Sequence, residues 1–195
     1  MDPFPHPGKR IAVIGVTGSG KTTMAARLAQ ALGLVHVELD ALHWEANWTN
    51  PPIDVFRSRV TEALQGPAWV TDGNYSKVRD IIWKRADTVV WLDYPFLICF
   101  WRLMHRSLRR VVYQEELWNN NRETLRGMLF MKDAIIPWLF KTYPRRRREY
   151  PQLLALPENA HLRLIRLRTP RQADAWLASL AAIASGGFDT QRVPD

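Results

Sequence analysis

The sequence predicts an α/β protein in which helices cover both faces of a parallel sheet. Two observations support this class. Short apolar segments alternate with segments of helical periodicity, and the first apolar segment is a near-continuous run, typical of a strand buried on both faces. Hydrophobic residues make up 47% and charged residues 24% of the 195 residues, which excludes a disordered, collagen-like or coiled-coil chain. The length suits a single domain over residues 1–195, with at most an inserted lid.

Five strands are predicted from short apolar segments. They cover residues 11–16, 34–39, 68–71, 88–92 and 162–167. The second, third and fourth of these strands end at Asp40, Asp72-Gly73 and Asp93. Because ligands bind beyond the carboxyl ends of parallel strands, the residues that follow each strand are the places to search for function.

Helices are predicted between and after the strands from their boundary signals. They cover residues 20–32, a segment from Pro51-Pro52 to Leu64, a segment that Ser76 caps, a long region over residues 96–143, and a last helix from Thr169-Pro170. Gly33 provides a C-terminal stop for the first helix, and proline is favoured at the start of a helix. The Ser76 hydroxyl is expected to accept a hydrogen bond from a free backbone N–H of its helix. Right-handed crossovers connect the parallel strands through these helices.

The turn after the first strand carries the strongest motif in the chain. Residues 15–22 match G-x-x-x-x-G-K-[ST], and a predicted strand precedes them while a predicted helix follows. The glycines permit a loop whose N–H groups point inward at a phosphate, and the helix N-terminus adds partial positive charge. We expect Lys21 to reach the terminal phosphates of ATP and the Thr22 hydroxyl to bind Mg²⁺. The expected nucleotide-binding residues are Gly15, Thr17, Gly18, Ser19, Gly20, Lys21, Thr22 and Thr23.

Two carboxylates that end neighbouring strands are candidates for the chemistry. Asp72 could hold Mg²⁺ as the second acid of the site, or it could be the turn residue of an Asp-Gly corner. Asp40 could accept a proton from an attacking hydroxyl, or it could cap a helix or turn. The aromatic residues after Asp40, His43, Trp44 and Trp48, could stack on a ring of the acceptor or pack against the next helix.

Positive charge is concentrated in residues 102–148. This stretch holds ten Arg and two Lys against four acidic residues, a balance that equals the formal net charge of +8 of the whole chain. Three interpretations compete: a lid that closes arginines over the triphosphate, a surface that binds nucleic-acid phosphates, or a solvated helix face. Arg102, Arg106 and Arg110 recur at helical spacing and fit the lid best. The run Arg145–Arg148 points in several directions on a helix, so its four members cannot all enter one site.

Four features together resemble the adenylate kinase-like P-loop phosphotransferases: the glycine-rich loop, Asp40, Asp72-Gly73, and the Arg-rich region after the fourth strand. The phrases LDALHW, TDGNYSKVRD, VVWLDYP, ELWNNNRE and RLRTPRQADAWL are more closely similar to bacterial topology-modulation (FlaR-related) proteins, over residues 9–182. The resemblance implies a three-layer P-loop NTPase fold with strand order 2-3-1-4-5 and a helical Arg-rich lid over residues 100–148. It also implies an adenine pocket near Arg168 and Pro170.

The chain departs from the adenylate kinase pattern after Asp72-Gly73. That pattern continues Phe-Pro-Arg, whereas this chain has Asn74-Tyr75-Ser76, and Arg79 lies one helical turn further along. An Asp directly after the second strand is instead similar to shikimate- and gluconate-type kinases, whose acceptor is a hydroxyl. The residues expected at the acceptor are Asp40, His43, Trp44, Asp72, Gly73, Asn74, Tyr75 and Arg79.

The sequence therefore predicts an ATP- and Mg²⁺-dependent phosphotransferase acting on a nucleotide or a small hydroxylated metabolite. The alternative is a nucleotide-regulated protein that binds nucleic acid and modulates DNA topology. The single cysteine, Cys99, cannot form an internal disulfide, so a reducing cytoplasm is the expected compartment. No apolar stretch is long enough to span a bilayer, and the oligomeric state is not predicted.

Overall fold

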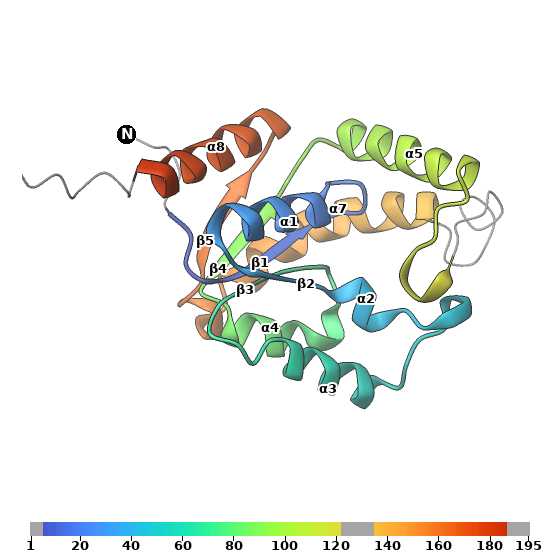
Figure 1. Cartoon of the computed structure of the whole chain (residues 1–195), viewed down its shortest axis with the longest axis horizontal. Helices are drawn as coiled ribbons and strands as arrows, with labels where there is room; N and C mark the ends of the chain where they lie inside the picture. The colour runs from blue at the N-terminus through green and yellow to red at the C-terminus, as the bar shows by residue number, and fades with distance from the viewer. Residues whose placement is uncertain (1–5, 122–134, 187–195) are drawn as a thin grey trace, which may run out of the picture.

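The computed structural model describes residues 6–121 and 135–186, and its centre is a sheet of five parallel strands (Figure 1). The strands are β1 (Arg10–Gly15), β2 (Val35–Glu38), β3 (Trp69–Asp72), β4 (Thr88–Leu92) and β5 (Arg163–Leu167). Their order is β2-β3-β1-β4-β5, and every neighbouring pair is parallel. The predicted fold class and strand order are confirmed.

Burial across the sheet follows the apolar pattern of the strands. β3 and β4 are buried along their whole length, and in β1 all residues after Arg10 are buried. The edge strands β2 and β5 expose some of their residues, and this agrees with sequences that are more polar than those of the central strands. The phosphate loop follows β1, and the register brings the end of β1 beside the ends of β3 and β4.

Helices cover both faces of the sheet. They are α1 (Lys21–Leu32), α2 (Leu39–His43), α3 (Ile53–Ala63), α4 (Arg79–Arg85), α5 (Phe96–Val112), α7 (Ile135–Leu154) and α8 (Pro170–Gly186). In Figure 1, α1 and α8 lie above the sheet while α3 and α4 lie below it. Met24 and Trp176 pack in the core of the first face, and Phe56 and Ile82 pack in the core of the second. No described helix combines the length and apolarity needed to cross a membrane.

Most helix boundaries agree with their sequence signals. Gly33 has φ 64° and its N–H donates to the Ala29 carbonyl, so it ends α1 as predicted. The Thr169 hydroxyl accepts a hydrogen bond from the backbone N–H of Gln172 at 3.1 Å, which fits the start of α8. The prediction for Ser76 is wrong. A 3₁₀ turn, η2 (Ser76–Val78), begins at Ser76 itself and precedes α4. The N-cap positions are therefore Tyr75 and Val78, and neither side chain caps its element.

The long helical region predicted over residues 96–143 is not continuous. α5 ends at Val112, and a loop with the 3₁₀ turn η3 (Trp118–Asn120) follows, in which Asn119 and Asn120 have positive φ angles. The buried Asn121 fixes this loop by accepting from the Trp48 N–H and donating to the Glu45 carbonyl, both at 2.8 Å. Residues 122–134 of the expected lid lie outside the described residues, so the lid remains a prediction.

Candidate functional site

The phosphate loop connects the buried end of β1 to α1. Gly18 and Gly20 have φ angles of 78° and 87°, which favour glycine, and the Ser19 N–H donates to the Val16 carbonyl at 3.1 Å. The Ser19 side chain is fully buried, and no described residue hydrogen-bonds its hydroxyl. A buried hydroxyl without a protein partner, in a glycine-rich loop directly before a helix N-terminus, fits a loop that receives an anion.

Lys21 begins α1 and turns its ammonium group into the site. Nζ donates to the Val16 carbonyl at 3.1 Å, so the side chain folds back across the loop. Burial of the ammonium group lowers its pKa, and the nearby arginines Arg106 and Arg146 lower it further, although Asp72 and Asp40 raise it. A phosphate bound at this loop would stabilise the charged lysine, so the residues fit a nucleotide.

Thr22 and Asp72 meet at the position predicted for Mg²⁺. The Thr22 hydroxyl donates to Oδ2 of Asp72 at 2.6 Å, and Asp72 is 5% exposed at the end of β3. On the other side, His36 of β2 hydrogen-bonds Oδ1 of Asp72 at 2.9 Å, and this contact raises the pKa of His36. Hydroxyl and carboxylate oxygens are the ligands that Mg²⁺ prefers, so this pair fits the metal. His36 was not predicted as part of the site.

Asp40 lies in the first turn of the short helix α2, not directly after the strand as expected. Its Oδ1 accepts a hydrogen bond from the Tyr75 hydroxyl at 2.5 Å. The His43 ring packs on Tyr75 and Trp44, with ring centroids 4.4 Å and 5.0 Å apart. The structure therefore brings four predicted acceptor residues together, and it also packs Trp44 against Trp48.

Asn74 links the end of β3 to the phosphate loop. Its amide Nδ2 donates to the Gly15 carbonyl, and Oδ1 accepts from the Gly15 N–H at 3.3 Å. The Tyr150 hydroxyl also donates to Oδ1, at 2.8 Å, while Arg146 donates to the Asn74 carbonyl at 2.9 Å. Asn74 was predicted to bind the acceptor, and the structure directs its side chain to the first residue of the loop.

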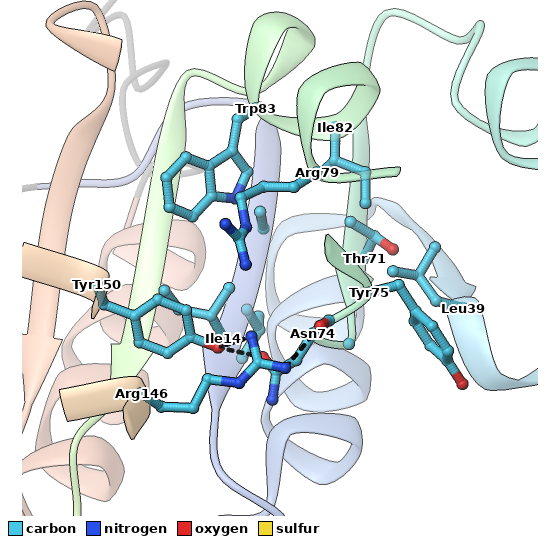
Figure 2. A pocket seen from close by; sticks show the side chains of 13 residues that line it. Ile14, Leu39, Thr71, Asn74, Tyr75, Arg79, Ile82, Trp83, Arg146 and Tyr150 are labelled. Carbon is cyan, nitrogen blue, oxygen red and sulfur yellow. Dashed lines mark hydrogen bonds between the residues drawn. The ribbon is translucent and has the colours of Figure 1, made fainter. Parts of the chain in front are cut away.

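A pocket beside Asn74 contains two guanidinium groups. Figure 2 shows Arg79 of α4 and Arg146 of α7 directed toward each other, with Trp83, Ile14 and Tyr150 around them. Arg146 is 6% exposed and also hydrogen-bonds the Tyr150 hydroxyl at 3.1 Å. Burial lowers the pKa of Arg79, and the positive charge of Arg146 adds to this effect. Among the described residues, no carboxylate forms an ion pair with either guanidinium.

The three arginines predicted for a lid occupy successive turns of α5 but have different surroundings. Arg102 donates to the Ser19 carbonyl at 3.3 Å and lies over the Tyr94 ring. Arg106 is close enough to lower the pKa of Lys21. Arg110 lies near Glu115, with its Nε 3.9 Å from the carboxylate.

The remaining predicted residues lie in the phosphate loop, on α1, and after β3 and β5. Thr17 is partly buried in the loop, and Thr23 is exposed on α1. Gly73 has φ 139° and lies against the Leu39 side chain, where a Cβ would come within 2.9 Å of Cδ1. Arg168 and Pro170 follow the edge strand β5, where the Arg168 N–H donates to the Gln172 side chain at 2.8 Å.

Sequence reasoning did not single out Arg146, Tyr150 or Glu38. Arg146 and Tyr150 are four residues apart in α7, and this spacing is a local signal that they share a helix face. Glu38 ends β2 and accepts a hydrogen bond from the Trp118 indole at 3.0 Å. That contact crosses 80 residues of chain, so no local pattern could reveal it.

Comparisons with known proteins agree with this architecture. A family model described as an AAA domain matches residues 11–114, more than half of the chain. A search of curated proteins finds no significant match.

Among solved structures, a shikimate kinase from Bacteroides thetaiotaomicron has 15% identity and a TM-score of 0.51, covering 91% of this chain and 98% of that chain. A gluconokinase from Sinorhizobium meliloti 1021 has 20% identity and a TM-score of 0.47, covering 93% and 98%. A shikimate kinase from Acinetobacter baumannii, in complex with shikimate, has 20% identity and a TM-score of 0.48, covering 93% and 96%. At these identities the first structure shows a shared fold, that of P-loop kinases.

The family match spans β1, the phosphate loop, and the residues after β2 and β3 that surround Lys21. The chain therefore belongs to the AAA domain family.

Proposed function

We propose that this protein transfers the γ-phosphoryl group of ATP to a hydroxyl group of a small-molecule acceptor. The observation that carries the proposal is the position of Lys21, whose buried ammonium group is within electrostatic reach of both Asp72 and Asp40. A phosphate-binding cation, a carboxylate suited to a metal and a second carboxylate on the acceptor side are the groups that this transfer needs. The shared fold of the solved shikimate kinase supports the same reaction class.

Each group has one role in the proposed transfer. Lys21 and the loop amides bind the phosphates, and Thr22 with Asp72 would hold Mg²⁺, which neutralises phosphate charge when it is bound. Asp40 accepts the proton of the acceptor hydroxyl. The hydroxyl oxygen forms a bond to the γ-phosphorus while the bond from that phosphorus to the β–γ bridging oxygen breaks, so the products are ADP and a phosphate ester.

The two guanidinium groups beside Asn74 support an acceptor that also carries an anionic group. The pocket between them, of about 20 Å³, holds little more than a water molecule, but Arg79 and Arg146 also line an adjacent cleft of about 400 Å³, together with Glu149. A planar carboxylate or a phosphate can accept parallel hydrogen bonds from a guanidinium. We therefore propose a hydroxylated acid or a nucleoside monophosphate as the acceptor, and its hydroxyl would face Asp40.

The nucleic-acid alternative receives less support from the described arginines. Several of them have intramolecular partners: Arg109 with Glu115, Arg145 with Glu149, Arg147 with Asp93, and Arg102 with the Ser19 carbonyl. A guanidinium that is already paired inside the protein is less available to neutralise a phosphate, so its binding would displace fewer counterions from a nucleic acid. This arrangement favours a small acceptor over a nucleic-acid surface.

The test is acceptor-dependent ADP release with Mg²⁺ across a panel of AMP, GMP, CMP, gluconate, shikimate, adenosine and a 5′-hydroxyl oligonucleotide. We expect one of the small acids or nucleotides to stimulate release. Lys21→Ala should lower this rate at least about 100-fold, the scale for losing one preorganised charge-stabilising group. Lys84→Ala, at an exposed position on α4, is the matched control and should keep the wild-type rate. ADP release that no acceptor stimulates would contradict the proposal.

A further inference from the structure

The Asp40 carboxylate is held at one of its two oxygens. The Tyr75 hydroxyl donates to Oδ1 at 2.5 Å, and no hydrogen bond from another described residue reaches Oδ2. Tyr75 belongs to the connection after β3, whereas Asp40 belongs to α2 after β2. This contact therefore ties the two acceptor-side segments together and leaves one carboxylate oxygen for a ligand.

The direction of the hydrogen bonds around Tyr75 follows from the donors available. The phenol has one proton to give, and it points to the carboxylate, which only accepts. Burial, reinforced by the negative charge of Asp40, raises the pKa of Tyr75, so the phenol stays protonated and remains a donor throughout the physiological range.

The ring of Tyr75 has little freedom to move. His43 packs on it with a centroid distance of 4.4 Å, and Phe56 packs on it at 5.2 Å. Phe56 is itself 1% exposed in the core below the sheet. A hydroxyl on such a ring is a fixed point, whereas a carboxylate alone turns readily about its terminal torsion.

We propose that Tyr75 is a positioning residue, which holds Oδ1 of Asp40 so that Oδ2 faces the hydroxyl of the acceptor. This inference rests on the proposed function, because the orientation of Asp40 affects the rate only if Asp40 removes a proton. Tyr75 does not touch the reacting atoms, and its whole effect passes through Asp40. Two neighbouring residues after β3 then have different roles. Asn74 binds the backbone of the phosphate loop, and Tyr75 orients the carboxylate that accepts the proton.

The test compares Tyr75→Phe with wild type, using the panel acceptor that gives the fastest ADP release. The variant keeps the packed ring and removes only the hydroxyl. We expect kcat to fall about 10-fold, the scale for a hydrogen bond to a charged group, while the KM and Kd for ATP stay within twofold of wild type. Tyr113→Phe removes a phenol that is 73% exposed and should change none of these constants.

A second comparison separates positioning from a general structural role. If Tyr75 acts through Asp40, then Tyr75→Phe should change the residual single-turnover rate of Asp40→Asn by less than twofold. An equal 10-fold loss in both backgrounds would overturn the inference, as would wild-type kcat in Tyr75→Phe when Asp40→Asn is impaired. Wild-type turnover in Asp40→Asn would instead refute the proposed role of Asp40 itself. These outcomes therefore distinguish the failure of the inference from the failure of the proposed function.

Discussion

Helix α5 packs directly onto the phosphate loop at Gly18, and this contact makes a quantitative prediction. A Cβ added at Gly18 would lie 2.2 Å from the Cys99 carbonyl oxygen and 3.1 Å from Cβ of Leu103. Both neighbours are fully buried residues of α5, and the closest atom belongs to the backbone. Gly18→Ala must therefore displace either the helix or the loop.

Gly33 provides a matched control for the same substitution. Its φ of 64° is close to the 78° of Gly18, but a Cβ at Gly33 meets nothing within 4 Å. Both substitutions introduce left-handed backbone strain, which costs about 1 kcal/mol. Gly18→Ala adds overpacking, which costs about 2 kcal/mol more. We expect losses in the free energy of unfolding of about 1 kcal/mol for Gly33→Ala and about 3 kcal/mol for Gly18→Ala.

Equilibrium urea denaturation of the two variants measures this difference, and thermal unfolding should show a gap of about 4 to 8 °C between them. ATP affinity should also fall in Gly18→Ala and stay unchanged in Gly33→Ala, because only the first site belongs to the loop. Equal losses of stability in the two variants would refute the conclusion that α5 presses on the loop at Gly18.

Three further predictions concern single side chains. Burial raises the pKa of Cys99 to about 11, so about 0.1% of the thiol is ionised at pH 8; a thiol-reactive dye should label it only after unfolding, and prompt labelling of the native protein would count against its burial. Asp93, whose side chain is 2% exposed, pairs with two arginines, so Asp93→Asn should cost about 2 kcal/mol in urea denaturation after allowing for the partial exposure of those partners; an unchanged midpoint would refute a structural role. The Arg57 guanidinium lowers the pKa of Asp80, so their ion pair stabilises the fold at pH values above the ordinary pKa of an aspartate, and this stabilisation is lost as the pH falls through the lowered pKa. Asp80→Asn should therefore lower Tm at pH 7 but not in strong acid. A lower Tm of the variant that persists in strong acid would contradict this pH dependence.

The sheet and the phosphate loop were predictable because their signals are local. A buried parallel strand requires an apolar run, and a phosphate-binding turn requires glycines at fixed spacing before Lys21 and Thr22. Asp72 could be placed at a strand end for the same reason. Its contact with Thr22 follows from the position of β3 beside β1. The family resemblance implied this neighbouring order, and the structure adds the register.

The partners of these residues were not predictable, because each depends on contacts between distant segments. Arg146 lies in a run of four arginines, and only the packing of α7 decides which of them is buried against Asn74. The contact of Tyr75 with Asp40 joins helix α2 to the connection after β3, across 35 residues of chain. The end of α5 was missed because the loop after it is held by Asn121, whose partners belong to the segment around Glu45.

Asn74 connects the two halves of the proposed reaction. Its side chain bonds both backbone groups of Gly15, the first residue of the phosphate loop, and its carbonyl accepts from Arg146, which lines the cleft proposed for the acceptor anion. Arg146 also acts on the loop electrostatically, since its charge lowers the pKa of Lys21. An anion bound at Arg146 would offset that charge and favour the protonated lysine that a phosphate needs.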